Sequence, residues 1–248
     1  MTERRRFRLL GRMGLRPTVT DVVRGRLDAA FAALEPARAA AGETGVAVDA
    51  LDAGCGRVSA LTRYRSRIRR LVGADLHQPP PGALPYLDAF LEVDLCAAEP
   101  PIAEGSFDLV LSSFTAEHFW DPPAAFLNMR RWLRPGGCLV LTTVNRRHPF
   151  VAAYLGIPER VRRPLQSLVK ASAADAHPLV GICNDPATIR SALSASGFID
   201  IRVELVPHLA RAWGRRLPAW ALGLVGDLAA QPFPSRRSTI IADAKVPG

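Results

Sequence analysis

Two glycines and an acidic residue are spaced as a nucleotide-binding turn requires. The segment LDAGCGR (51–57) is a short apolar run that ends at Gly54 and Gly56. Glycines there let backbone N–H groups approach a ligand closely, and the N-terminus of a following helix favours polar or anionic groups. Asp75 ends a second apolar run twenty-one residues after Gly54, where an acid can accept hydrogen bonds from both ribose hydroxyls. The spacing predicts a nucleotide-type site.

Two further acids narrow the kind of ligand. Asp52 precedes the glycines, and Asp94 ends a third apolar run. Together with Asp75 they would line the carboxyl edge of adjacent strands, where open α/β sheets bind ligands. A dinucleotide remains an alternative, but its G-x-G-x-x-G pattern has Ser59 at the sixth position here, and acids repel a pyrophosphate. The acidic rim suits a cationic cofactor without phosphate better.

The elements that must position these residues alternate between strand and helix. A helix is expected over 57–67 and another over 122–133, where Asp121 is the cap and Pro122 lies in the first turn. Alternation of this kind predicts an α/β fold with a parallel sheet. The expected strands are 46–53, 69–76, 90–95, 106–113, 138–144, 198–206 and 238–246.

The remaining segments predict the domain organisation. Residues 1–45 are predicted to form a helical N-terminal extension or lid, with Thr20 and Asp21 as a helix cap. Residues 46–248 are predicted to form one domain. A further helix is expected to start at Asp185-Pro186 and end at Gly197. Two irregular segments, 146–185 and 207–235, are expected to be insertions that cover the core.

A series of segments in register resembles the class I S-adenosylmethionine-dependent methyltransferases of the small-molecule type. The resemblance runs in order, at family-like spacing, from about Val46 to Asn145. It rests on VDALDAGCG, VGADL, EVDL, SFDLVLSSFTAEHFWDP and AFLNMRRWLRPGGCLVLTTVN. It implies a Rossmann-like sheet of seven mostly parallel strands with helices on both faces, in which residues 238–246 supply an antiparallel C-terminal strand.

The resemblance also implies which residues hold the cofactor, S-adenosylmethionine, which leaves as S-adenosylhomocysteine. The glycine loop would cradle its methionine part, Asp75 its ribose and Asp94 its adenine amino group. The cofactor-binding residues expected are Asp52, Gly54, Cys55, Gly56, Asp75, Leu76, Asp94, Leu95 and Ser112. One position departs from the family: the usual third glycine is Val58, which disfavours positive φ and adds bulk near the methionine tail.

Residues after the fourth and fifth strands are candidates for the acceptor side. His118 is the candidate base, because its ordinary pKa suits neutral pH; the alternative is a structural Glu117–His118 pair. Phe114 and Trp120 offer aromatic faces for a sulfonium. The segment 142–150 resembles one that carries Asn145 toward the substrate cleft in many small-molecule members, and Arg146 could meet an anionic group or solvent. No metal site is expected, since no histidine and cysteine have ligand spacing.

These features favour a cytoplasmic methyltransferase with a small-molecule acceptor: a natural product, a sugar or a lipid-linked precursor, with O-methylation slightly favoured. The formal charge of +9 keeps an RNA methyltransferase as an alternative, although Asp121-Pro122-Pro123 lacks the aromatic of a base-flipping motif. Because Val58 replaces the usual third glycine, a catalytically impaired scaffold that binds the cofactor is a second alternative.

No apolar run is long enough to span a bilayer. The segment 217–230 is expected to pack over the pocket or to touch a membrane surface beside Arg211, Arg215 and Arg216. The four cysteines are expected to be buried free thiols. The oligomeric state stays open.

Overall fold

The structure is a computed structural model in which part of the chain is described. The described residues are 3–42, 45, 48–56, 59–78, 82, 84–158, 160–161, 180–213 and 217–248. Val58, His177, Arg215 and Arg216, which the sequence singles out, lie outside these ranges.

Seven strands form one sheet in the order β3-β2-β1-β4-β5-β7-β6. Only β7 runs antiparallel to its neighbours, β5 and β6, so the predicted α/β fold with an antiparallel C-terminal strand is confirmed. The strands are β1 (Val48–Ala53), β2 (Ile68–Asp75), β3 (Ala89–Glu92), β4 (Phe107–Ser113), β5 (Leu133–Val144), β6 (Ile199–Val206) and β7 (Thr239–Lys245).

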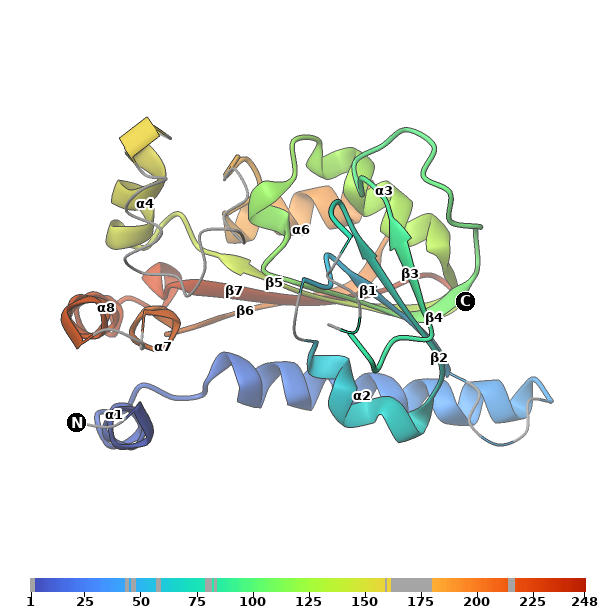
Figure 1. Ribbon diagram of the computed structural model, residues 1–248, viewed down its shortest axis with the longest axis horizontal. Coiled ribbons are helices and arrows are strands. Elements are labelled where there is room, and N and C mark those ends of the chain that lie inside the picture. Colours follow the sequence, from blue (N-terminus) through green and yellow to red (C-terminus); the bar gives the residue numbers. More distant parts are fainter. Residues whose placement is uncertain are drawn as a thin grey trace.

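Helices cover both faces of this sheet (Figure 1). On one face lie α3 (Pro122–Trp132) and α6 (Pro186–Ala195), and on the other lie α2 (Val19–Ala40) and the short helical segment η1 (Ala60–Arg67). Each face has its own apolar core, because a central parallel strand such as β1 is buried along its whole length. The helix expected over 57–67 therefore exists in part, as η1.

The long helix α2 belongs to the core. Its apolar residues recur at helical spacing, and Val23, Leu27 and Phe31 are buried against the sheet. It begins earlier than expected: the cap is Thr18, whose hydroxyl accepts from the Asp21 N–H at 3.1 Å while the Asp21 carboxylate accepts from the Thr18 N–H at 3.0 Å. The expected cap at Thr20 was wrong, because this reciprocal capping box satisfies two free donors at once.

Strand β5 is longer than the expected 138–144, since it starts at Leu133. The RPGG segment (134–137), which lies between the expected helix 122–133 and the expected strand, is therefore part of the strand. Gly137 explains how: a Cβ there would lie 2.8 Å from the Arg134 carbonyl oxygen and 3.2 Å from that of Asp108. Only a glycine lets the two backbones approach this closely, so a sequence typical of a turn continues into the sheet.

An ion-pair network around two buried carboxylates ties the strands together at their amino ends. The Arg134 guanidinium donates to Asp108 Oδ2 at 2.8 Å and to Asp49 Oδ2 at 2.9 Å, and Arg69 donates to the same Asp49 oxygen at 2.6 Å. Burial raises the pKa of Asp49, but the hydrogen bonds from Arg69 and Arg134 outweigh it and hold that pKa below its usual range. This edge is thus occupied by structural charges, which leaves the opposite, carboxyl edge for a ligand.

Two segments expected to be irregular contain helices. The first includes α4 (Pro149–Gly156), and the second includes α7 (Leu209–Ala212), α8 (Leu217–Ala230) and the short segment η4 (Pro234–Arg236). With α1 (Glu3–Arg12) they gather at one end of the molecule, on the left in Figure 1. No helix of the described residues is long and apolar enough to cross a membrane.

Candidate functional site

The glycine loop after β1 is held against β2 by backbone hydrogen bonds. The Gly54 N–H donates to the Ala74 carbonyl at 2.7 Å, and the Gly56 N–H donates to Asp75 Oδ2 at 3.0 Å. Both glycines have positive φ, 78° at Gly54 and 51° at Gly56, which other residues adopt only with strain. The structure therefore brings together Gly54, Gly56 and Asp75, which the sequence predicted would share one site.

Asp52 lies beneath this loop with an unsatisfied oxygen. Its side chain is buried, and Oδ2 has no hydrogen-bond partner among the described residues. The pKa of Asp52 is raised to about 7, mainly by burial; the nearby Asp75 carboxylate adds to the rise, and a hydrogen bond from Ser59 opposes it. A buried carboxyl group with a free oxygen is a natural partner for a donor or a cation on a ligand.

The raised pKa of Asp52 predicts how the stability of the protein depends on pH. Between its ordinary pKa of 3.8 and about 7, Asp52 keeps a proton in the folded state that the unfolded chain releases. The free energy of unfolding therefore falls as pH rises through that window, by a few kcal/mol at most, roughly. We expect Asp52→Asn, which cannot ionise, to melt at increasingly higher temperature than the wild type between pH 4 and pH 8. Thermal melts without ligand measure this, and a difference that is constant with pH would contradict it.

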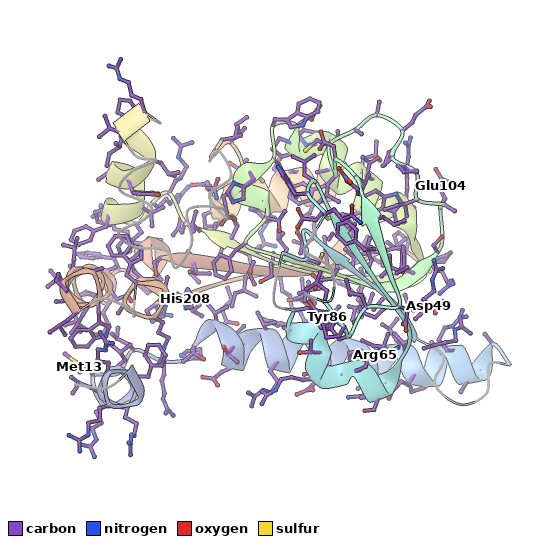
Figure 2. The ribbon with its side chains drawn as sticks, in the orientation of Figure 1. Met13, Asp49, Arg65, Tyr86, Glu104 and His208 are labelled. Carbon is purple, nitrogen blue, oxygen red and sulfur yellow. The ribbon has the colours of Figure 1, made fainter. Side chains whose placement is uncertain are left out.

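Tyr86 is a site residue that sequence reasoning missed. Its hydroxyl is buried without a hydrogen-bond partner among the described residues. Burial raises its pKa to about 12, and the charges of Asp52 and Cys55 add to the effect, which places Tyr86 near both. The only sequence signal was an aromatic residue in the connection between β2 and β3 (Figure 2). Two unsatisfied buried oxygens thus lie near the glycine loop.

Asp94, after β3, faces the same edge and already has two donors. Its Oδ1 accepts from the Cys96 N–H at 2.8 Å, and its Oδ2 accepts from the Trp120 indole N–H at 2.9 Å. The Trp120 side chain is otherwise 58% exposed. Trp120, predicted on the substrate side, therefore covers the carboxylate predicted to meet adenine. A carboxylate has lone pairs to spare, so a ligand amino group can still bind Asp94 beside the indole.

The other expected cofactor residues divide by burial. Cys55 is buried, and burial raises its thiol pKa to about 12, so only its backbone can face a ligand. Leu95 is buried in the core on the α3 side of the sheet, whereas Leu76 is exposed. Ser112 on β4 is fully buried, and its hydroxyl has no partner among the described residues.

The turn after β4 brings Thr115 against the glycine loop, where its hydroxyl lies 3.4 Å from the Gly54 carbonyl oxygen. Phe114 has a positive φ of 55°, and its N–H donates to the Thr142 carbonyl at 2.9 Å. Its ring stacks on His208 at 5.5 Å between centroids. Burial lowers the pKa of His208 to about 4, so this imidazole is neutral at pH 7. Phe114 thus takes a strained backbone conformation beside the predicted site.

Glu117 and His118 differ in exposure. Glu117 is buried; its Oε2 accepts from the Thr143 hydroxyl at 2.8 Å, and its carbonyl accepts from the Val180 N–H at 3.0 Å. His118 is partly exposed, on the short segment η2 (Ala116–His118) that Glu117 fixes. Glu117 therefore positions the turn, while the predicted role of His118 as a base stays a prediction.

Asn145 and Arg146 follow β5. Asn145 is fully buried; its amide donates to the carbonyls of Ser235 and Arg237 at 3.0 and 2.7 Å, and its oxygen accepts from the Arg147 N–H at 3.0 Å. These bonds leave no side-chain hydrogen for a substrate, so the amide holds the segment after α8 in place. The Arg146 side chain is exposed, and its predicted contact with an anionic group stays a prediction.

A cavity of about 250 Å³ lies elsewhere, between α2 and strands β5 and β7. Its charged groups pair with one another: Arg26 and Arg202 both bond to Asp243. It shares no residue with the glycine loop, so it is not part of the candidate site. The four cysteines, as expected, are buried and free.

A cationic ligand fits this carboxyl edge. Asp52 offers an unsatisfied carboxylate oxygen, Asp75 and Asp94 add two partly exposed carboxylates, and the glycine backbone leaves the space that a side chain at Gly56 would enter. A pyrophosphate would meet the carboxylates of Asp75 and Asp94 beside the Asp52 carboxyl group there, which opposes its binding. These acceptor oxygens thus match the ammonium and sulfonium charges and the ribose hydroxyls of the predicted cofactor.

Comparisons with known proteins agree with this geometry. Residues 51–141 match the family model described as a methyltransferase domain. The chain is 30% identical over 170 residues to nocamycin O-methyltransferase of Saccharothrix syringae, covering 62% of this chain and 60% of that protein. It is 31% identical over 102 residues to a probable S-adenosylmethionine-dependent methyltransferase of Mycolicibacterium smegmatis, covering 40% and 38%. The chain thus spans less than two thirds of either relative.

Solved structures show the same fold. Phosphoethanolamine N-methyltransferase 2 of Haemonchus contortus, in complex with S-adenosyl-L-methionine, aligns with a TM-score of 0.53 at 19% identity, over 89% of this chain and 53% of that one. A methyltransferase of Haloferax volcanii, bound to the activator Trm112, aligns with a TM-score of 0.53 at 18% identity, over 92% and 94%. By its matched segment, strand order and glycine loop, the chain contains a methyltransferase domain over residues 51–141 and has the fold of the class I S-adenosylmethionine-dependent methyltransferases.

Proposed function

We propose that this chain binds S-adenosylmethionine at the carboxyl edge of β1, β2 and β4 and transfers its methyl group to a hydroxyl oxygen of a small molecule. The observation that carries the proposal is the glycine loop hydrogen-bonded to Asp75 above the unsatisfied Asp52. The relative that acts as an O-methyltransferase on nocamycin supports oxygen as the acceptor atom.

In this proposal the residues divide the work by position. Asp52 and the glycine backbone hold the amino-acid end of the cofactor, Asp75 holds the ribose, and Asp94 with Trp120 holds the adenine. The bound cofactor supplies a methyl group on a positively charged sulfur. Phe114 and the buried turn around Glu117 keep water from the methyl group, because in-line displacement depends mainly on positioning and exclusion of solvent.

Methyl transfer to a hydroxyl group requires a proton acceptor, and His118 is the residue proposed for it. A C–O bond forms as the C–S bond breaks, and the hydroxyl proton must leave the oxygen. In this proposal the His118 imidazole takes that proton and later returns it to water. Cytoplasmic localisation and a small, anionic or neutral, acceptor belong to the same proposal.

Calorimetry with S-adenosylhomocysteine, followed by methyl-transfer assays on a panel of small hydroxyl compounds, tests the proposal. We expect saturable binding and product formation. His118→Ala is expected to lower turnover by about 10²–10⁴-fold while the affinity for S-adenosylhomocysteine stays within about twofold, since no cofactor contact is removed.

The outcomes separate the alternatives. Absence of binding would remove the whole proposal. Binding without transfer to any acceptor would leave a cofactor-binding scaffold, and transfer to RNA alone would favour the nucleic-acid reading. Unchanged turnover in His118→Ala, with the same melting temperature as the wild type, would remove His118 from the mechanism and leave the rest standing.

A further inference from the structure

The helices at one end of the molecule form a unit that we name the helical lobe: α1, α7, α8 and η4. Leu10 and Leu15 from the N-terminal segment pack with Ala210 of α7 and Trp220 of α8. A Cβ at Gly223 would lie 2.9 Å from the Ala210 backbone, so α8 and α7 touch closely. The inner face of α8 is therefore firmly packed.

Asp227, the one charged residue of α8, also belongs to this inner face. Its Oδ2 accepts from the Ala210 N–H at 2.9 Å, and its Oδ1 accepts from the Ser238 hydroxyl at 3.0 Å. The side chain is buried. The one charged side chain of α8 is thus buried inside the lobe, and the outer face of the helix carries no charge.

The outer face of α8 is entirely apolar. The exposed residues are Leu217, Pro218, Ala221, Leu222, Val225 and Ala229. They fall within about 140° of the helix circumference, and the largest are more than half exposed, 54% at Leu217, 51% at Leu222 and 58% at Val225. A surface helix ordinarily turns polar residues outward, so this face has the character of an interaction surface.

Positive charge is concentrated in the same lobe. By sequence, the two segments that build it, 3–20 and 207–238, contain eleven arginines and two acidic residues, Glu3 and the buried Asp227. The formal charge of the whole chain is +9, so the remainder of the chain is close to neutral. Arg5, Arg8 and Arg12 are exposed at helical spacing on one side of α1. Figure 2 shows Met13, at the end of that helix, below α8.

We propose that the helical lobe docks on an anionic lipid surface, with the outer face of α8 in the interfacial layer and the arginines against lipid phosphates. Apolar side chains flanked by cations are the combination that lipid interfaces bind. A second copy of this chain would bring arginine-rich lobes together, which like-charge repulsion opposes. A nucleic acid would leave the apolar face in water. The helix α8 has 14 residues, which is too short to span a bilayer, so in this proposal it lies on the lipid surface.

Flotation of the full chain with vesicles tests this proposal directly. We expect binding to vesicles of equal parts phosphatidylcholine and phosphatidylglycerol to be at least about tenfold stronger than to phosphatidylcholine alone, and to weaken with salt. The double variant Leu222→Glu, Val225→Glu and the triple variant Arg5→Gln, Arg8→Gln, Arg12→Gln should each reduce vesicle binding by about tenfold or more. Leu127→Glu, an exposed leucine on α3, is the matched control and should bind as the wild type does.

Melting temperatures check that the variants are folded, and the double variant Leu222→Ser, Val225→Ser serves if the glutamates prevent folding. Absence of vesicle binding would overturn the proposal. So would a dimer, seen by light scattering, that the α8 variants dissociate. Binding to RNA that depends on the arginines and ignores Leu222 and Val225 would also overturn it, in favour of a nucleic-acid surface. None of these outcomes depends on methyl transfer.

Discussion

Gly54→Ala is expected to destabilise the protein far more than Gly56→Ala, although both residues lie in one loop with positive φ. A Cβ at Gly54 would lie 2.2 Å from the Thr115 Oγ1 and 2.7 Å from its Cβ, whereas a Cβ at Gly56 meets nothing within 4 Å. Position 56 therefore adds backbone strain of about 1–2 kcal/mol. Position 54 adds the clash as well, which brings the expected loss of unfolding free energy to about 3–5 kcal/mol.

Denaturant titration of both variants measures this difference. The clash is with one side chain, so Thr115→Gly provides a specific rescue: in that background the two alanine variants should become similarly stable. Equal destabilisation by the two variants in the wild-type background would contradict the close contact between the glycine loop and the turn after β4. Calorimetry should also show weaker S-adenosylhomocysteine binding by Gly54→Ala, because relief of the clash with Thr115 must shift the glycine loop.

The glycine loop also shows which residues of the site can be predicted from the sequence. Asp52, Gly54, Gly56 and Asp75 were predictable because strand ends, glycine turns and acids are local patterns with a fixed geometric consequence. Parallel strands place their carboxyl ends at one edge, so the order of motifs along the chain was enough to bring them together. The α/β class and the antiparallel β7 follow from the same regularity and from the family resemblance.

Residues whose role depends on long-range packing were not predictable in this way. Tyr86 is close enough to Asp52, thirty-four positions earlier in the sequence, for the Asp52 charge to act on its hydroxyl. Trp120 covers Asp94 across twenty-six positions of sequence. Asn145 was expected in the cleft, but its amide bonds to carbonyls ninety residues away. No local pattern carries such information, because each contact depends on how separate segments meet.

The charge of the chain gives the clearest example. In sequence the arginines are dispersed and form no single stripe. The fold brings the N-terminal segment beside α7 and α8, and two dispersed groups of arginines become one lobe. The apolar segment 217–230 likewise divides into a packed face and an exposed one, a division that depends on where α1 and α7 lie.

Asp75→Asn is expected to weaken S-adenosylhomocysteine binding by about 10²-fold while leaving the fold intact. Asp75 ends β2 with its carboxylate partly exposed, and it is the hydrogen-bond acceptor for the Gly56 N–H. Asparagine keeps an oxygen for that N–H, so the loop is preserved. It lacks the charge that strengthens hydrogen bonds to two ribose hydroxyls, and each charged hydrogen bond contributes about 1.5–3 kcal/mol.

Glu92→Gln is the matched control, because Glu92 pairs in register with Asp75 on β3 and is exposed at the same edge. If Glu92→Gln weakened binding as much as Asp75→Asn does, the effect would come from the summed negative charge at this edge and not from a contact between Asp75 and the ligand. A second readout separates a ligand contact from loop damage. The Asp75 charge raises the pKa of Asp52, so in Asp75→Asn that pKa should fall. The upper end of the pH window in which Asp52→Asn gains stability over its parent should then move to lower pH, which thermal melts detect without any ligand.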